Sequence, residues 1–228
     1  MRINPANLHA VNLANFDVLI VKIIMLGRYY SPLKEDIQLE ALKSVSQNAK
    51  VAIANAEELY AQYIHEINVR EVAFSELNVL YQAIFKLLSA ITKMNETEVY
   101  MLLGTQKVVH SQFANQERYD FLLDNFCKII KMLKVNPRYL PQDRQLEIVE
   151  LEGYYASLYL KNNKVRQIYA LFCNALMVRD EVMYRDNYGL VALTAQVKIY
   201  IKYHFGWNSE EYKQISRLVI RQHTAPKN

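Results

Sequence analysis

The chain has 228 residues, enough for one large domain or two small ones with a buried core. A hydrophobic fraction of 52% excludes a disordered chain, and five glycines and five prolines are too few for the tight turns of an all-β or α/β fold. The formal net charge is +4: residues 1–114 hold 10 Lys and Arg against 11 Asp and Glu, whereas residues 115–228 hold 17 against 12. The only two cysteines cannot form a disulfide framework, so we expect a reducing compartment and a cytoplasmic protein.

The first expected helix covers residues 8–26 and ends at Gly27. Its apolar run, 18–26, resembles the core of a signal peptide. However, Lys22 interrupts this run, Asp17 precedes it, and no small-residue cleavage site follows. We interpret the segment as a buried or amphipathic helix that is too short and too charged to span a bilayer.

A long helix is expected next, because no glycine or proline occurs from Leu33 to Leu103. Proline 32 suits the first turn of this helix. Its apolar residues recur at alternating steps of three and four, the stripe of a helix packed lengthwise on another. The stripe consists of Leu39, Leu42, Ala49, Ile53, Ala56, Tyr60, Tyr63, Ile67 and Phe74, with Ser46 and Arg70 in its gaps. We place a change of direction between residues 74 and 78 and a separate helix over residues 79–93.

The same order of features returns 109 residues later. The matching positions are Tyr30 with Tyr139, Pro32 with Pro141, Tyr60-Ala61 with Tyr169-Ala170, Val69-Arg70-Glu71 with Val178-Arg179-Asp180, and Asn78 with Asn187. A second stripe falls in the same register: Ile148, Leu151, Tyr155, Leu158, Asn162, Val165, Tyr169, Phe172, Leu176, Arg179 and Met183. We therefore predict an internal duplication, with a first repeat at 1–114 and a second at 115–228. The expected fold is an all-α bundle of long antiparallel helices, one compact domain whose two helical units are related by a pseudo-twofold axis.

A turn is expected at Asp186-Asn187-Tyr188-Gly189, and a last helix is expected to begin at the capping sequence Asn208-Ser209-Glu210-Glu211.

Catalytic and metal-binding motifs are missing from the sequence. None of the five histidines has a glutamate three residues before it, so the ligand pattern of a di-iron bundle is not met. The zincin pair of histidines, the Gly-x-Ser-x-Gly nucleophile motif and glycine-rich phosphate loops do not occur either. We predict no enzyme activity, no cofactor and no metal site.

Two arginines, Arg70 and Arg179, lie on the stripes of their repeats, where an unpaired charge is costly to bury. Each is followed by an acid, Glu71 or Asp180. If the repeats pack symmetrically, the arginines can approach the axis and pair with acids of the other half. We favour structural salt bridges over an anion-binding site, which stays the alternative.

Tyrosine is unusually frequent, with 17 residues, and Tyr154, Tyr155 and Tyr159 crowd one helix. Such a face suits a subunit interface, because each ring buries area while its hydroxyl stays hydrated. Packing within the chain is an equal alternative.

Basic residues recur in the second half, and Lys128, Lys131, Lys134 and Arg138 include three lysines spaced by three. We favour a solvated helix face over a nucleic-acid surface, which these residues would form if they shared one exposed side.

Several motifs carry a family resemblance: Asn15-Phe16-Asp17, Tyr30-Ser31-Pro32, Val69-Arg70-Glu71-Val72-Ala73-Phe74, Val178-Arg179-Asp180-Glu181-Val182-Met183-Tyr184, Tyr188-Gly189-Leu190-Val191 and Phe205-Gly206-Trp207-Asn208-Ser209-Glu210-Glu211-Tyr212-Lys213-Gln214-Ile215-Ser216. With them the chain resembles an uncharacterised all-helical protein family of Bacteroidota bacteria that has an internal duplication and no assigned activity. The resemblance implies the helical fold and the duplication without supplying a mechanism.

From these observations we predict a non-enzymatic structural or protein-interaction module whose partner is a second copy of itself or another protein. The alternative is a nucleic-acid-binding protein that uses the basic second half.

Overall fold

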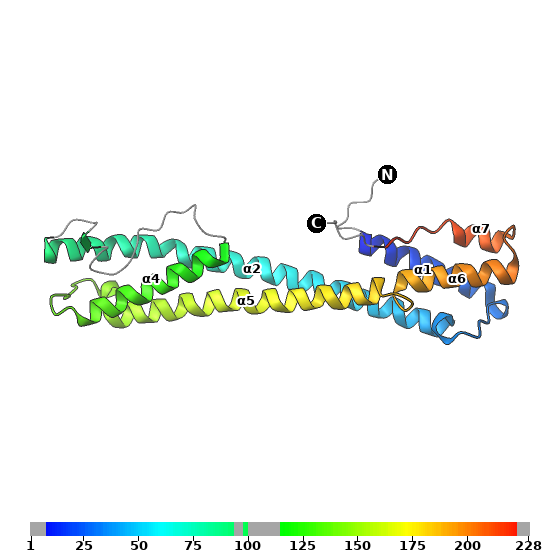
Figure 1. The fold of residues 1–228 in the computed structure, drawn as a ribbon, viewed down its shortest axis with the longest axis horizontal. Helices are drawn as coiled ribbons and strands as arrows, with labels where there is room; N and C mark the ends of the chain where they lie inside the picture. The colour runs from blue at the N-terminus through cyan, green and yellow to red at the C-terminus, as the bar shows by residue number, and fades with distance from the viewer. Residues whose placement is uncertain (1–7, 94–97, 100–114, 223–228) are drawn as a thin grey trace. The chain divides into compact units, whose positions relative to one another are not determined.

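The computed structural model describes residues 8–93, 98–99 and 115–222. Within these ranges all regular structure is helical, which confirms the predicted all-α class (Figure 1). The α-helices are α1 (Leu8–Leu26), α2 (Leu39–Thr92), α4 (Asn115–Val135), α5 (Ile148–Tyr184), α6 (Leu190–Phe205) and α7 (Glu210–Ser216). Short 3-10 turns at Glu35–Ile37 and Arg144–Leu146 precede the two long helices.

The chain forms two compact units, and the two long helices each contribute to both. Unit 1 consists of Met1–Tyr60 and Leu171–Asn228, and unit 2 of Ala61–Ala170. Unit 1 therefore holds α1, α6, α7, the start of α2 and the end of α5, while unit 2 holds the rest of α2, α4 and the start of α5. Both predicted repeats supply residues to both units, and residue 114, where the first repeat was placed to end, lies outside the described residues.

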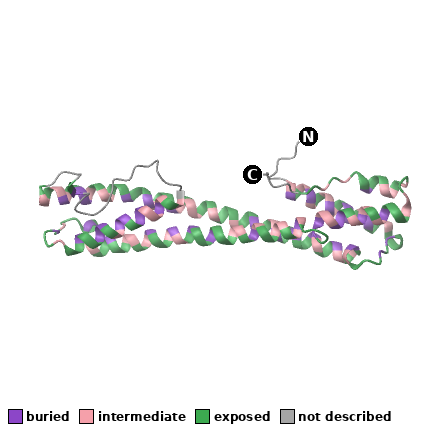
Figure 2. Cartoon of the chain, viewed as in Figure 1, coloured by how far each residue is buried: buried purple, intermediate pink, exposed green. Residues whose placement is uncertain are grey.

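The core of unit 2 forms where buried residues of α2, α4 and α5 meet (Figure 2), and these residues are apolar. Among its fully buried side chains are Leu77, Ile84 and Leu88 of α2, Phe126, Ile129 and Leu133 of α4, and Leu151 and Leu158 of α5. Their spacing of three, four or seven residues on each helix is the helical period that the stripe argument uses. Each such burial contributes about 1.5–3 kcal/mol, so this apolar contact is what holds the three segments together.

The core of unit 1 is built from five helical segments. Its buried side chains are Phe16, Leu19 and Ile23 of α1, Leu42 and Ala49 of α2, Met183 of α5, Leu193, Val197 and Ile201 of α6, and Ile215 of α7. Helix α7 begins as its capping sequence predicts, because the Ser209 hydroxyl accepts a hydrogen bond from the Tyr212 N–H at 3.1 Å.

Helix α1 has the bounds that the sequence predicts, and it ends at Gly27, whose φ of 53° suits glycine. By length and composition, the segment Leu8–Tyr29 is apolar and long enough to cross a membrane, and only 28% of its most apolar window is buried. The argument from length and charge against a membrane span therefore does not hold. Its buried side chains nevertheless belong to the core of unit 1.

The long helix starts later than the sequence predicts. Helix α2 begins at Leu39 rather than near Pro32, because Gln38 is extended at φ −67° and ψ 152°. The preceding 3-10 turn buries Ile37 in the core, which ties the chain down before the helix begins.

The change of direction predicted between residues 74 and 78 is wrong, since α2 continues through Thr92. Phe74 and Leu77 are buried in the core of unit 2. The Ser75 hydroxyl donates to the Val72 carbonyl at 2.7 Å, so this polar residue is satisfied within the helix. Nothing here supplies the glycine or proline that a break requires.

The corresponding break does occur in the second half, where α5 ends at Tyr184 and α6 begins at Leu190. The predicted turn at residues 186–189 is confirmed. Asn187 has a φ of 68°, and a Cβ at Gly189 would lie 2.6 Å from the backbone nitrogen of Arg185. The turn therefore needs a glycine at position 189.

Two buried tyrosines form equivalent hydrogen bonds within the loops that precede α2 and α5. The Tyr30 hydroxyl donates to the Ile37 carbonyl at 2.6 Å in unit 1, and the Tyr139 hydroxyl donates to the Leu146 carbonyl at 2.7 Å in unit 2. Burial raises the pKa of both hydroxyls, to about 12 for Tyr139. Both carbonyls therefore depend on a tyrosine for a hydrogen bond that water cannot easily replace.

We expect Tyr30→Phe and Tyr139→Phe each to lower the free energy of unfolding by about 1–2 kcal/mol, because each leaves a carbonyl without its donor. Tyr203→Phe is the matched control, since Tyr203 is 84% exposed. Urea unfolding followed by circular dichroism measures the effect. Equal stability of all three variants would contradict this role of the hydroxyls.

We also expect stability to fall in alkali. The pKa of Tyr139 is raised from 10.0 to about 12 in the folded chain, so its protonated hydroxyl stabilises the fold fully below pH 10. That contribution is lost as pH rises from about 10 through 12, because the unfolded chain releases the proton first. Urea unfolding between pH 8 and 11.5 should show a smaller loss for Tyr139→Phe than for the parent. A parallel loss in both proteins would overturn the assignment.

Candidate functional site

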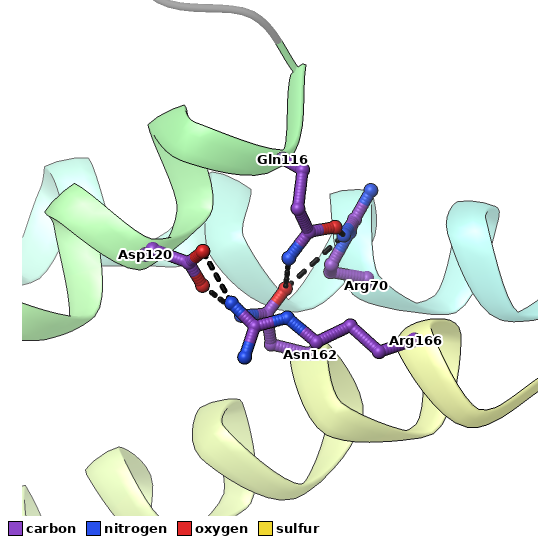
Figure 3. A network of polar contacts seen from close by, with 5 residues as sticks. All are labelled: Arg70, Gln116, Asp120, Asn162 and Arg166. Atoms are coloured by element: carbon purple, nitrogen blue, oxygen red, sulfur yellow. Dashed lines mark hydrogen bonds and ion pairs between the residues drawn. The ribbon is translucent and has the colours of Figure 1, made fainter. Parts of the chain in front are cut away.

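A network of polar side chains joins the three helical segments of unit 2 (Figure 3). From α2, the Arg70 Nη1 donates to Gln116 Oε1 of α4 at 2.7 Å and to Asn162 Oδ1 of α5 at 3.1 Å. The amide nitrogen of Gln116 donates to the same oxygen of Asn162 at 3.1 Å. The amide nitrogen of Asn162 donates to Asp120 of α4 at 2.8 Å, and Arg166 of α5 forms an ion pair with that carboxylate. One asparagine thus connects all three helices.

Arg70 is the buried charge of this network. It is 4% exposed, and its guanidinium carbon lies 3.9 Å from the centre of the Tyr119 ring. Burial lowers the pKa of Arg70, since the charged form loses water. Its Nε is buried with no hydrogen-bond partner in the part of the chain that the structure describes. Two amide oxygens and an aromatic face therefore take the place that a carboxylate usually fills.

This network holds three helices together through hydrogen bonds. Asn162 accepts hydrogen bonds from α2 and α4 and donates one to α4, so these polar contacts favour one register of the three helices. Among the described residues, no group of three or more His, Cys, Asp and Glu side chains could hold a metal ion.

The two predicted arginine–acid pairs differ in the structure. Glu71 is exposed beside Arg70, whose acceptors are the amides of α4 and α5. Arg179, in unit 1, donates from Nη2 and Nε to Asp180 Oδ1 at 2.7 and 2.9 Å. Arg70 thus contacts the other half of the sequence through amides, and Arg179 pairs with its own neighbour. The expected pairing of both with acids of the other half is not what these contacts show.

The three tyrosines proposed as an interface divide between the core and the surface of unit 2. The Tyr154 hydroxyl donates to the Ala73 carbonyl at 2.6 Å, and burial raises its pKa to about 12. Tyr155 is half-buried and stacks on Tyr159, which is about half exposed. Tyr154 therefore packs within unit 2, and Tyr159 is the more exposed of the three tyrosines proposed as an interface.

The proposed basic patch lies on and just after α4. Lys128 forms an ion pair with Asp124 at 2.6 Å, and Lys134 forms one with Glu152. Lys131 and Arg138 are exposed. Acids thus neutralise two of these four cations, which weakens the face as a binder of phosphates.

An open groove between α2 and α5 crosses unit 2 beside the network. Its volume is about 500 Å³, and it is lined by His65, Asn68, Val69, Val72, Ala73, Glu76, Tyr154, Ser157 and Lys161. Lys161 donates to the Ser157 hydroxyl at 2.9 Å, so part of its polar lining is already occupied. The groove is wide and of mixed charge, with no convergent set of acid–base groups.

Exposed apolar side chains on unit 1 form two surfaces that sequence reasoning missed. The α1 outer face consists of Val18, Val21, Ile24 and Met25, and the α6 outer face consists of Ile199 and Tyr203 of α6 with Trp207 just after the helix. Met25 is 80% exposed and Trp207 is 70% exposed. The sequence feature that could have indicated the α1 outer face is that apolar residues occur on every side of this helix. A helix of this kind is usually buried on all sides.

The chain matches no protein-family model, no curated protein and no solved structure. The family resemblance read from the sequence motifs therefore stays a prediction.

A double-mutant cycle tests the network. We expect Asn162→Leu to lower the free energy of unfolding by about 3 kcal/mol, because it leaves a buried guanidinium short of an acceptor. Arg70→Leu combined with Asn162→Leu should regain part of that loss, since the buried charge is gone. Urea unfolding measures all the variants. Strict additivity of the two changes would show that Arg70 and Asn162 do not act together.

Proposed function

We propose that this protein is a non-catalytic helical module that self-associates. The observation that carries the proposal is the α1 outer face, an exposed row of large apolar side chains on a helix whose opposite side is buried in the core of unit 1. Exposed apolar surface of this kind marks an interaction site in folded proteins. A second copy offers the same face, so the contact can be self-complementary about a twofold axis.

The spacing of the α1 outer face supports a helix partner. Val18, Val21 and Met25 of this face, preceded by Ala14, follow one another at steps of four, three and four, which is the seam that two helices bury lengthwise. All four are exposed. The α6 outer face adds a tyrosine and a tryptophan, which are enriched in the buried centres of protein interfaces.

A protein partner fits α1 better than a lipid bilayer does. The polar side chains of α1 already have partners within unit 1: Asp17 binds Lys50 at 2.9 Å and Lys22 donates to Gln214 at 3.0 Å. Insertion of the whole helix into lipid would break these contacts as well as the apolar packing of Phe16. Among the residues of α1, the exposed large apolar side chains are those of its outer face.

We further propose that the two sequence halves are copies of one helical unit. Unit 2 begins at Ala61 and ends at Ala170, residues that are themselves separated by the 109-residue offset. The Tyr30 and Tyr139 hydrogen bonds obey the same offset. The Tyr60–Phe172 ring contact in unit 1 corresponds, at this offset, to the Tyr169–Tyr63 contact in unit 2, with centroid separations of 5.5 and 5.2 Å. As part of this proposal, the two copies are related by the pseudo-twofold axis that the sequence predicts.

Size-exclusion chromatography with light scattering tests the self-association. We expect the parent to form a dimer or larger assembly at micromolar concentration, and Val21→Glu with Met25→Glu to be monomeric with unchanged helical circular dichroism. Val79→Glu with Val149→Glu is the matched control, since both valines are over 70% exposed on unit 2.

A parent that stays monomeric at every concentration would contradict the proposal. Binding of the parent to lipid vesicles, lost in the Val21→Glu/Met25→Glu variant, would reassign the face to a membrane. A high ratio of absorbance at 260 to 280 nm that added salt removes would favour the nucleic-acid alternative.

A further inference from the structure

An extended segment of six residues follows α7 and lies along α1 in unit 1. This C-terminal strap, residues 217–222, has no regular secondary structure after its first residue. Its path is nevertheless defined by hydrogen bonds to residues about 200 positions earlier in the chain.

Two asparagines of α1 bind the backbone of the strap. The Asn12 side chain donates to the Arg221 carbonyl at 2.8 Å and accepts from the Arg221 N–H at 3.0 Å, so one amide satisfies both backbone groups of a residue. The Asn15 side chain donates to the Val219 carbonyl at 2.8 Å. Asn12 is 1% exposed, which means that this polar group is built into the packed interior of unit 1.

A lysine of α6 binds the start of the strap. The Lys198 ammonium donates to the Leu218 carbonyl at 2.6 Å and to the Ser216 carbonyl at 3.4 Å. Leu218 and Ile220 pack against the core of unit 1, whereas Val219 and Arg221 are exposed. Alternate side chains thus point inward, as they do along an extended strand.

The contacts with Asn12, Asn15 and Lys198 are made to the backbone, and two apolar side chains of the strap pack on the core. The exposed residue Gln222 adds one side-chain contact, because its amide donates to the Tyr184 carbonyl at 3.1 Å. Proteins that bind extended peptides use the same combination: main-chain hydrogen bonds supply affinity, and pockets for alternate side chains supply selectivity. On α1, the Asn12 and Asn15 side chains bind this segment, whereas Asp17 and Lys22 bind residues elsewhere in unit 1.

We propose that the surface formed by Asn12, Asn15 and Lys198 is a binding site for an extended peptide of a partner protein with apolar side chains at alternate positions. In this structure the strap occupies the site in cis. A peptide in trans competes with a tethered segment whose effective concentration is in the millimolar range, so the strap regulates access to the site. The proposal does not rest on the α1 outer face, because Asn12 and Asn15 lie on a different side of that helix.

The test uses the full chain with its strap weakened by Leu218→Lys and Ile220→Lys. The probe is a fluorescein-labelled peptide with the sequence of residues 216–222, followed by fluorescence anisotropy. We expect saturable binding to the strap variant and at least tenfold weaker binding to the parent, because the intact strap competes. A control peptide with lysine at both apolar positions should not bind. Asn15→Leu in the strap variant should weaken binding about two- to tenfold through the lost hydrogen bond.

Absence of saturable binding to a strap variant that keeps the parent's circular dichroism would overturn the proposal, as would equal binding of the control peptide. If the strap variant fails to fold, hydrogen exchange on the parent decides. We then expect the Arg221 amide, which is bonded to Asn12, to exchange at least tenfold faster than the core amides of α1. Exchange of Arg221 only at the rate of global unfolding would show that the strap never leaves its site.

Discussion

The continuity of two long helices is the constraint on which the rest of the structure depends. Helices α2 and α5 each supply one segment to unit 1 and another to unit 2. Helix α2 can do this because no glycine or proline interrupts it, and helices of this length persist only when apolar packing accompanies them. Helices of both sequence halves supply that packing, with α4 in unit 2 and α1 and α6 in unit 1.

One position bears on why α5 ends where α2 continues. Gly189 permits the turn between α5 and α6, and the residue 109 positions earlier is Leu80, which lies within α2. A side chain cannot fit at the turn, so its presence at position 80 favours an uninterrupted helix. Under the proposed duplication, α5 followed by α6 corresponds to the single helix α2.

Periodicity and capping residues were enough to predict the helical class, the bounds of α1, the turn at residues 186–189 and the cap of α7, because each depends on local sequence. The start of α2 was missed because it depends on burial of Ile37, which is a tertiary contact. The predicted change of direction is wrong because it rests on two polar residues, Ser75 and Asn78, and no glycine or proline accompanies them.

The partners of Arg70 could not be predicted at all. They depend on the register of α4, where Gln116 lies in the first turn, and an amide acceptor has no periodic signature. Which side of α1 is covered was equally hidden, since its sequence is apolar on every side. The strap combines both difficulties, because its partners lie about 200 residues away and bind its backbone.

The central claim is that each compact unit requires both halves of the sequence. The most direct test is light scattering with circular dichroism on residues 1–114 alone, on residues 115–228 alone, and on their equimolar mixture. The account predicts that neither half is a folded monomer and that the mixture forms a one-to-one complex with the helical signal of the intact chain. A stable, cooperatively unfolding monomer of either half would contradict it.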